Sequence, residues 1–208
     1  MGKVARGDGL ACVVHGKPYA GINGSGKNNN WSMVTNEGKN LLNPGPNPVE
    51  NHSFLVTLCA VIAAVDDYAD LIRLSAACPG NDLRLGGNEA PPAVISVFLG
   101  EKLTSLFQSL ADGHAYEMGE RDPLLTGVKT LPLLKQDDHD RNRTSPFAFT
   151  GNKFEFRMLG SSQSVGLAHP VLSAAVAGQR AGFADILEEE NPEEIAAVII
   201  EGIQGVAG

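Results

Sequence analysis

The sequence predicts an α+β fold in which an antiparallel sheet is packed by helices. Residues 153–158 alternate charged and apolar side chains, which is the two-residue period of a strand. Apolar residues recur at helical spacing over residues 53–75, with Ser53 available as the N-cap, so we expect one long buried helix there. The tail at 171–206 is rich in Ala, Glu and Ile, which predicts two helices separated at Asn191.

The rest of the chain predicts one short strand, long loops and a further helical region. Residues 11–14 are a strand candidate, and the Gly-, Asn- and Pro-rich stretch of about thirty residues after them is predicted to be loop. A second Gly- and Asn-rich loop covers 78–92, and the apolar segment 93–110 could continue as helix. Residues 112–140 have no clear period, which indicates an insertion or a mobile connection.

Composition describes an ordinary globular domain and excludes several partners. The chain has 208 residues, and its formal net charge of −8 argues against nucleic acid and anionic membranes. Cys12, Cys59 and Cys78 are odd in number and widely spaced, so neither a disulfide framework nor a zinc site is indicated. The longest apolar run, 54–65, is too short to span a bilayer, and no signal peptide is recognisable. We therefore expect a cytoplasmic protein.

The predicted strand at 153–158 carries Lys153, Glu155 and Arg157 on one face. Neighbours on that face stand about 6.6 Å apart, because each strand residue rises about 3.3 Å. Such a row suits the phosphate, metal and carboxylate groups of one ligand. An amphipathic strand with a solvated face and cross-strand ion pairs is the alternative interpretation.

The first loop contains the segment 23–27, Asn-Gly-Ser-Gly-Lys, where small residues let backbone N–H groups approach an anion. Gly21, four residues and then Gly26-Lys27 nearly spell a phosphate-binding loop. Asn28 stands where that motif requires Ser or Thr, however, so a true P-loop is disfavoured. A plain Asn/Gly turn cluster remains the alternative.

The second loop holds a single acid, Glu89, among glycines and prolines. A glutamate in this setting could act from a flexible flap over a site. An exposed turn carboxylate is the alternative, and nothing in the neighbouring residues decides between the two.

Three loops and one helix together resemble glutamine synthetase of the type III class. The loops are KPYAGINGSGKNNNWS at 17–32, NDLRLGGNEAPPAVISVFLG at 81–100 and DRNRTSPFAFTGNKFEFRMLGSSQS at 140–164. The helix is NHSFLVTLCAVIAAVDDYADLIR at 51–73. The resemblance covers nearly the whole chain, and its motifs are long and specific.

The resemblance implies an ATP-dependent ligation of glutamate and ammonia. In the family, the glutamate side-chain carboxylate attacks the terminal phosphate of ATP, and ammonia converts the γ-glutamyl phosphate to glutamine. Divalent ions, Mg²⁺ or Mn²⁺, neutralise the phosphates. The family enzyme forms homo-oligomeric rings with active sites shared between neighbours. Residues 1–208 then correspond to part of its catalytic domain.

Carried over position by position, the resemblance first gives a substrate set. Asn23 and Gly24 match the loop that holds the substrate glutamate. Arg84 matches the arginine that holds the substrate carboxylate, and Arg157 lies near the substrate and the γ-phosphate.

The nucleotide, metal and catalytic positions follow in the same way. Ser32 and Lys153 match nucleotide-binding residues, and Glu155 matches a metal ligand. Glu89 matches the flap glutamate that shields the acyl phosphate and helps to deprotonate ammonium. Arg143 matches the arginine that stabilises the transferring phosphoryl group.

Two departures from the family pattern bear on activity. Asn28 replaces a metal-binding histidine, and its amide oxygen should weaken a metal site. The family also needs an upstream region with an N-terminal domain and strands bearing paired glutamates, which this sequence does not contain. We therefore expect little or no activity from this chain alone. The alternatives are a non-catalytic protein that packs with intact glutamine synthetase subunits, and a γ-glutamyl ligase that uses another amine.

Overall fold

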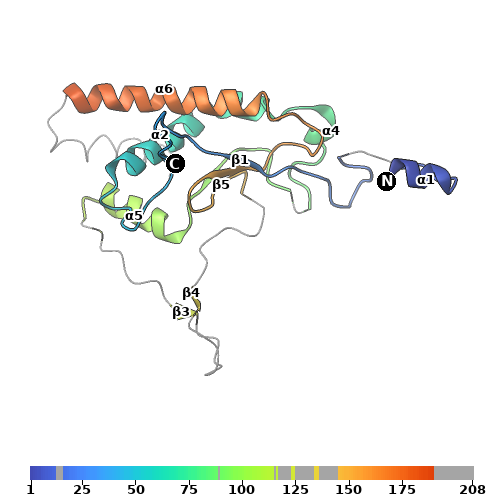
Figure 1. The fold of residues 1–208 in the computed structure, drawn as a ribbon, viewed down its shortest axis with the longest axis horizontal. Coiled ribbons are helices and arrows are strands. Elements are labelled where there is room, and N and C mark those ends of the chain that lie inside the picture. Colours follow the sequence, from blue (N-terminus) through green and yellow to red (C-terminus); the bar gives the residue numbers. More distant parts are fainter. Residues whose placement is uncertain are drawn as a thin grey trace.

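The computed structural model describes residues 1–12, 16–88, 90–114, 116, 123–124, 134–135 and 145–189 (Figure 1). The helices are α1 Gly2–Gly7, α2 His52–Asp67, α3 Ala69–Leu74, α4 Pro79–Asp82, α5 Glu101–Ala111 and α6 Ala168–Glu189. The strands are β1 Asn29–Trp31, β2 Val97–Phe98, β3 Pro123–Leu124, β4 Leu134–Lys135, β5 Phe147–Phe149 and β6 Phe154–Phe156.

The main sheet of the described part is mixed, so the predicted α+β class is right but a purely antiparallel sheet is wrong. Its strand order is β1-β6-β5-β2. β1 and β5 both pair antiparallel with β6, whereas β2 pairs parallel with β5. The parallel pair is possible because α5 and a long connection separate β2 from β5, which lets the chain return in the same direction.

Aromatic side chains from the two central strands form the middle of the core. The ring of Phe147 stacks on Phe154 at 4.5 Å between centroids and meets Phe156 edge-on at 6.0 Å. Phe154, Phe156 and Met158 have no exposed surface. The apolar half of the predicted alternation at 153–158 is therefore confirmed.

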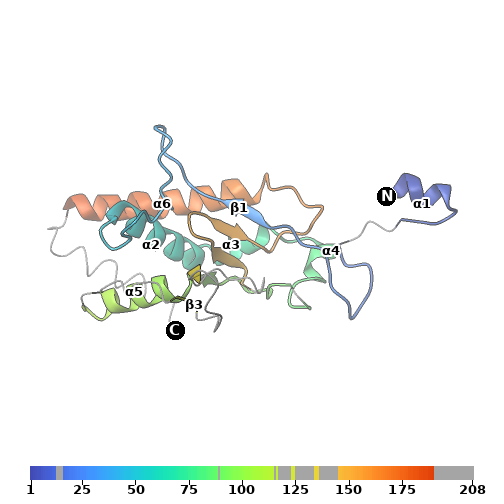
Figure 2. The same ribbon diagram turned by 60° about the horizontal axis from the view of Figure 1, so that its bottom comes forward.

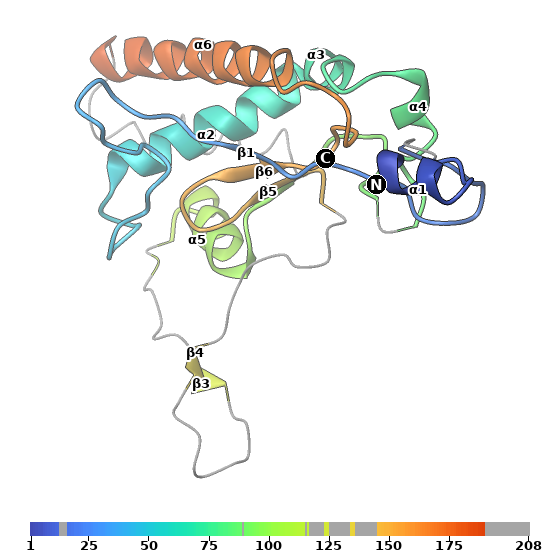
Figure 3. The same cartoon turned by 45° about the vertical axis from the view of Figure 1, so that its right-hand side comes forward.

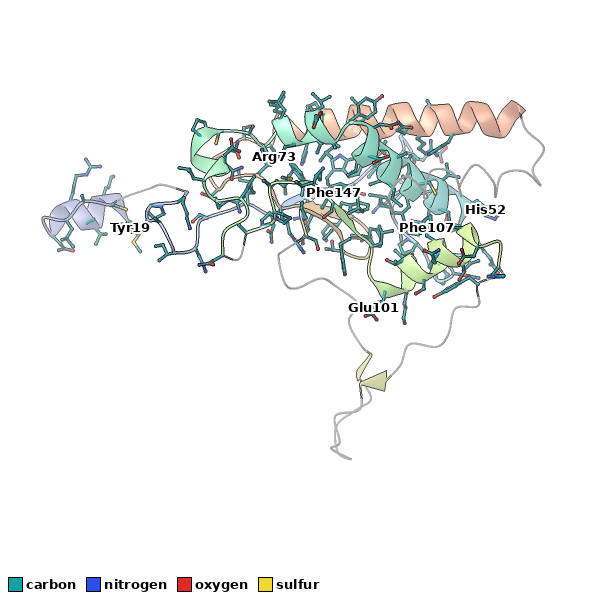
Figure 4. All side chains as sticks on the ribbon, turned by 180° about the vertical axis from the view of Figure 1, so that it is seen from behind. Tyr19, His52, Arg73, Glu101, Phe107 and Phe147 are labelled. Atoms are coloured by element: carbon teal, nitrogen blue, oxygen red, sulfur yellow. The ribbon has the colours of Figure 1, made fainter. Side chains whose placement is uncertain are left out.

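Helices cover the sheet in layers. α6 lies along α2, and α5 lies away from α6 with α2 and the sheet between them (Figures 2 and 3). α2 packs on the sheet through Phe54, whose ring centroid is 5.9 Å from that of Phe149 in β5. In Figure 4, Phe147 lies centrally among the packed side chains.

The long helix predicted at 53–75 is two helices. Tyr68, with φ −116° and ψ 23°, interrupts it between α2 and α3. The N-cap of α2 is Asn51 and not Ser53, because the Asn51 side chain accepts a hydrogen bond from the backbone N–H of Phe54 at 3.2 Å. Asp66 and Asp67 at the end of α2 are exposed, as the sequence predicts.

Some of the other predicted elements are wrong, and others lie outside the described residues. β1 lies inside the predicted first loop, and β2 lies inside the predicted helix at 93–110. Ala11 and Cys12 are not in a strand. α6 supplies the first of the two predicted tail helices, whereas the expected break at Asn191 and most of residues 112–140 lie outside the described residues. None of the described helices combines the length and apolarity that a bilayer-spanning segment requires.

Candidate active site

The β1–β6 ribbon contains a β-bulge at the end of β6. Asn29 pairs with Phe156, and an isolated bridge joins Gly26 to Gly160. On the first segment, two residues lie between the paired positions 26 and 29. On the second segment, three residues, 157–159, lie between the paired positions 156 and 160. One extra residue on the β6 side bends the strand and leaves backbone groups unpaired. The bulge explains why the consecutive residues Met158 and Leu159 are both fully buried.

The Arg84 side chain satisfies the carbonyl groups of this bulge. Its Nη2 donates to the carbonyl oxygens of Arg157 at 3.4 Å, Met158 at 3.0 Å and Leu159 at 3.2 Å. Its Nε donates to Oδ1 of Asn81 at 3.0 Å, and Nδ2 of Asn81 donates to the Met158 carbonyl at 2.7 Å. Arg84 is 4% exposed, and burial lowers the pKa of its guanidinium. The carbonyl oxygens replace the water that the guanidinium loses.

The first loop packs directly on the same arginine. A Cβ on Gly24 would lie 2.6 Å from Cγ of Arg84, and a Cβ on Gly26 would lie 2.6 Å from its Nη1. Glycine is therefore required at both positions for this close approach. The structure thus brings together Gly24, Arg84 and Arg157 of the predicted substrate set, with exposed Asn23 adjacent in the chain. Their contact with substrate stays a prediction.

The predicted nucleotide residues meet at the opposite end of the ribbon. Ser32 Oγ donates to Oδ1 of Asn40 at 2.7 Å and lies 3.5 Å from the carbonyl oxygen of Asn152. Asn40 Nδ2 also donates to the Asn152 carbonyl, at 2.8 Å. Asn152 directly precedes Lys153, which is partly buried and comes immediately before β6. Ser32 and Lys153 are therefore neighbours, although they are far apart in the sequence.

Glu155 lies between these two groups, in the middle of β6. It pairs in register with Asn30 of β1 and Ala148 of β5. Its Oε2 accepts hydrogen bonds from Nε and Nη2 of Arg157 at 3.3 and 3.2 Å. An ion pair is therefore present on this face, although it runs along one segment and not across strands as the alternative interpretation expected. The ligand-facing row stays a prediction.

The described residues do not assemble a complete divalent-metal site. Within the described ranges, no three His, Cys, Asp or Glu side chains gather closely enough to hold a metal ion. A hard cation such as Mg²⁺ needs about six oxygen ligands. The predicted ligand Glu155 is paired with Arg157, and exposed Asn28 offers one amide oxygen. These residues do not fit a complete site on their own.

One backbone hydrogen bond closes the second loop, and one side-chain hydrogen bond joins it to the first loop. The N–H of Gly86, at φ +77°, donates to the carbonyl of Pro91 at 2.9 Å. Asn88 Nδ2 donates to the Gly21 carbonyl at 3.3 Å. The predicted flap residue Glu89 and the predicted catalytic residue Arg143 lie outside the described residues.

A separate anchor holds the far base of the second loop. Arg73 Nε donates to the carbonyl of Ala93 at 2.8 Å, and its Nη2 forms an ion pair with Asp82 at 2.8 Å. Figure 4 shows Arg73 beside α4, where this base lies.

Sequence reasoning missed the asparagines that support the site. Asn81 stands three residues before Arg84 at the end of a helical turn, a spacing that places side chains on one face and could have indicated the contact. Asn29 of β1 contacts Nε2 of His169 in α6 at 2.7 Å. No local sequence pattern predicts the contacts of Asn29 or Asn40, because their partners are distant in the sequence.

Comparison with known proteins shows which proteins this chain is similar to. No family model matches the chain. It is 53% identical over 169 residues to the type-3 glutamine synthetase of Dictyostelium discoideum, covering 81% of this chain and 23% of the relative. It is 48% identical over 206 residues to a glutamine synthetase of Butyrivibrio fibrisolvens, covering 97% and 29%. A glutamine synthetase of Bacteroides fragilis (strain YCH46) is 43% identical over 212 residues, covering 98% and 29%.

The chain is therefore homologous to a segment of glutamine synthetases, and the resemblance seen in its motifs is confirmed. The type III class inferred from those motifs agrees with the name of the Dictyostelium relative. The chain spans less than a third of the length of each of these relatives.

Proposed function

We propose that the chain is part of a glutamine synthetase catalytic domain and takes part in forming glutamine from glutamate, ammonia and ATP. The order of residues along β6 carries this proposal. Lys153 and Ser32 lie at one end, and Glu155 lies in the middle. Arg157 lies in the bulge, where its carbonyl accepts from the Arg84 side chain that packs on Gly24. From position 153 to 157 a strand spans about 13 Å, enough for ATP phosphates to point from one end toward a substrate carboxylate at the other.

The chemistry consists of two displacements. An oxygen of the glutamate side-chain carboxylate attacks the γ-phosphorus of ATP, and the bond to the bridging oxygen breaks with ADP as the leaving group. Ammonia then attacks the acyl carbon, and inorganic phosphate leaves. We assign to Glu89 the acceptance of the proton that ammonium loses, and to Arg143 the stabilisation of the transferring phosphoryl group. When bound, Mg²⁺ or Mn²⁺ would neutralise phosphate charge.

Described residues contribute electrostatics and orientation to these steps. Lys153 and Arg157 place positive charge at both ends of the phosphoryl path, where negative charge spreads in the transition state. The ion pair with Glu155 limits the rotation of the Arg157 guanidinium. Asn23 and Gly24 position the glutamate, and the homo-oligomer of the family supplies the neighbouring part of the site.

Two preparations test the proposal. The first is the purified 208-residue chain. The second is a chimera in which this chain replaces the homologous segment of the Butyrivibrio relative, to which it is 48% identical. We expect the folded chimera to release phosphate from Mg²⁺-ATP only when glutamate and ammonium are both present, and the chain alone to be at least about tenfold slower. A folded chimera without this activity would contradict the proposal, and replacement of ammonium by primary amines identifies the nucleophile.

A second candidate is a non-catalytic protein that associates with intact glutamine synthetase subunits. The observation that favours it is Asn28, which is exposed and neutral where the family motif has a histidine. Co-purification with the full-length Butyrivibrio relative, combined with an inactive chimera that Asn28→His does not rescue, would favour this candidate.

A further inference from the structure

Arg73 of α3 bridges the two ends of the second loop. Its Nη2 forms an ion pair with the Asp82 carboxylate at 2.8 Å, and its Nε donates to the Ala93 carbonyl at 2.8 Å. Asp82 ends α4 just before the loop, and Ala93 follows the loop on the way to β2. One side chain from outside the loop therefore fixes the separation of its two ends.

The guanidinium of Arg73 is packed against the protein and is not simply extended into water. Its Nη1 is buried and has no hydrogen-bond partner among the described residues. A donor buried without a partner costs free energy, so the contacts of Nε and Nη2 must outweigh that cost. A guanidinium presents its N–H groups in a fixed plane and can hold two acceptors at once, whereas a lysine ammonium is a single point on a flexible stem. The two contacts thus favour arginine over lysine at this position.

Backbone hydrogen bonds close the loop inside this bridge. The N–H of Gly86 donates to the Pro91 carbonyl at 2.9 Å, and the N–H of Ala90 donates to the Gly87 carbonyl at 3.3 Å. Because the entropy cost of closing a loop grows with its length, a bridge that already holds the outer ends together makes the inner contacts easier to keep. The amides of Gly86 and Ala90 therefore report on whether the bridge is intact.

We infer that Arg73 is a positioning residue that holds the second loop closed, and that its loss lets water reach the acyl phosphate. This inference rests on the proposed function, in which the second loop shields γ-glutamyl phosphate. Water that attacks the acyl carbon forms a new C–O bond and breaks the bond from that carbon to the phosphate oxygen. Glutamate, inorganic phosphate and one proton are released, so ATP is hydrolysed and no glutamine forms.

Amide hydrogen exchange followed by NMR tests the bridge in the 208-residue chain without any turnover. We expect Arg73→Gln and Arg73→Lys to speed exchange at Gly86 and Ala90 by about tenfold or more, while the amides of α2 keep their protection. Arg180→Gln is the matched control, because Arg180 joins α6 to Thr57 of α2 at 3.3 Å and should leave exchange in the loop unchanged. Wild-type exchange at Gly86 and Ala90 in both Arg73 variants would overturn the inference.

Asp82→Asn tests the same bridge from its other side. The Asp82 side chain is 45% exposed, so this variant should fold even where substitution of Arg73 prevents folding. Asparagine removes the charge but leaves the contact between Arg73 and Ala93, so we expect exchange at Gly86 and Ala90 to rise by only about two- to fivefold. If the Arg73 variants do not fold, a wild-type exchange pattern in Asp82→Asn would refute the bridge.

The ratio of products in the chimera separates positioning from a simple loss of stability. We expect wild type to release about one phosphate per glutamine formed, and Arg73→Gln to release at least about two. Arg73→Gln should also release phosphate from Mg²⁺-ATP and glutamate when ammonium is absent. A purely structural role lowers both products together and keeps the ratio near one, as we expect for Arg180→Gln.

A ratio of about one in a folded, active Arg73→Gln chimera would contradict the inference, because water would then still be excluded from the acyl phosphate. An inactive wild-type chimera refutes the proposed function instead. Exchange at Gly86 and Ala90 in the 208-residue chain still decides whether Arg73 holds the loop, so the two failures are distinguishable.

Discussion

The Glu155 carboxylate accepts two hydrogen bonds from the guanidinium of Arg157, which lies two positions further along the same segment. The Arg157 side chain is 5% exposed and that of Glu155 is 20% exposed, so the pair is largely removed from water. A charge-assisted contact in this setting is stronger than a surface ion pair. It also places the predicted metal ligand and a predicted substrate residue in direct contact.

Glu155→Gln should therefore destabilise the chain measurably. Glutamine keeps the shape but removes the charge opposite a buried guanidinium, and we expect the free energy of unfolding to fall by about 1 to 2 kcal/mol in urea titrations. Glu101→Gln is the control, because Glu101 is exposed at the start of α5 and should change it by less than about 0.5 kcal/mol. Equal effects of the two substitutions would show that the ion pair contributes nothing to stability.

Two glycines should respond in opposite directions to alanine. In Gly24→Ala the Cβ would meet Cγ of Arg84 at 2.6 Å and the backbone oxygen of Gly16 at 2.8 Å, so we expect a loss of about 1 to 3 kcal/mol. Gly178 lies in α6 with no atom within 4 Å of its added Cβ, so alanine there should stabilise the helix by about 0.5 to 1 kcal/mol. Thermal unfolding of both variants checks this, and a stabilising Gly24→Ala would contradict the packing described above.

The start of α2 distinguishes the predicted cap from the observed one. The Asn51 side chain accepts from Phe54 N–H and also donates to the carbonyls of Asn43 and Pro44 at 3.1 and 3.2 Å. Asn51→Ala should therefore cost about 1 to 2 kcal/mol in chemical denaturation. Ser53→Ala, one residue inside the helix start, should cost less than about 0.5 kcal/mol. The reverse order would restore Ser53 as the cap.

Cys59 gives the chain a pH dependence in the alkaline range. Burial raises the pKa of its thiol from the ordinary value of 9.0 to about 12. The folded state then holds a proton that the unfolded state releases above pH 9, so stability falls as pH rises between about 9 and 12 and is unaffected below 9. We expect wild type to lose about 1 kcal/mol more than Cys59→Ala between pH 8 and pH 10. Parallel losses in both proteins would exclude the thiol as the source.

Local patterns predicted the parts of the fold that short-range periodicity determines. The alternation at 153–158 correctly places Phe154, Phe156 and Met158 in the core, because burial on one face of a strand follows directly from its two-residue period. The helical spacing after residue 53 correctly predicts the buried face of α2. The motif loops also contain the residues that the structure brings together around Arg84.

The features that sequence could not predict depend on distant partners. β1 has a loop-like composition, Asn-Asn-Trp, and becomes a strand because it pairs with β6. The bulge depends on a residue count across two segments, so no pattern in either segment reveals it. The motif predicts Arg84 as a site residue, and that role stays a prediction. The partners that the structure shows, Asn81 and three backbone carbonyls, are assembled only in the folded chain.

The most direct test of the account is phosphate release by the chimera carrying Glu155→Gln. We predict that release dependent on both glutamate and ammonium falls by about a hundredfold or more, while Glu101→Gln retains wild-type rates and both chimeras stay folded. A folded Glu155→Gln chimera with wild-type turnover would show that the middle of β6 takes no part in the ligation, and would contradict the proposed site.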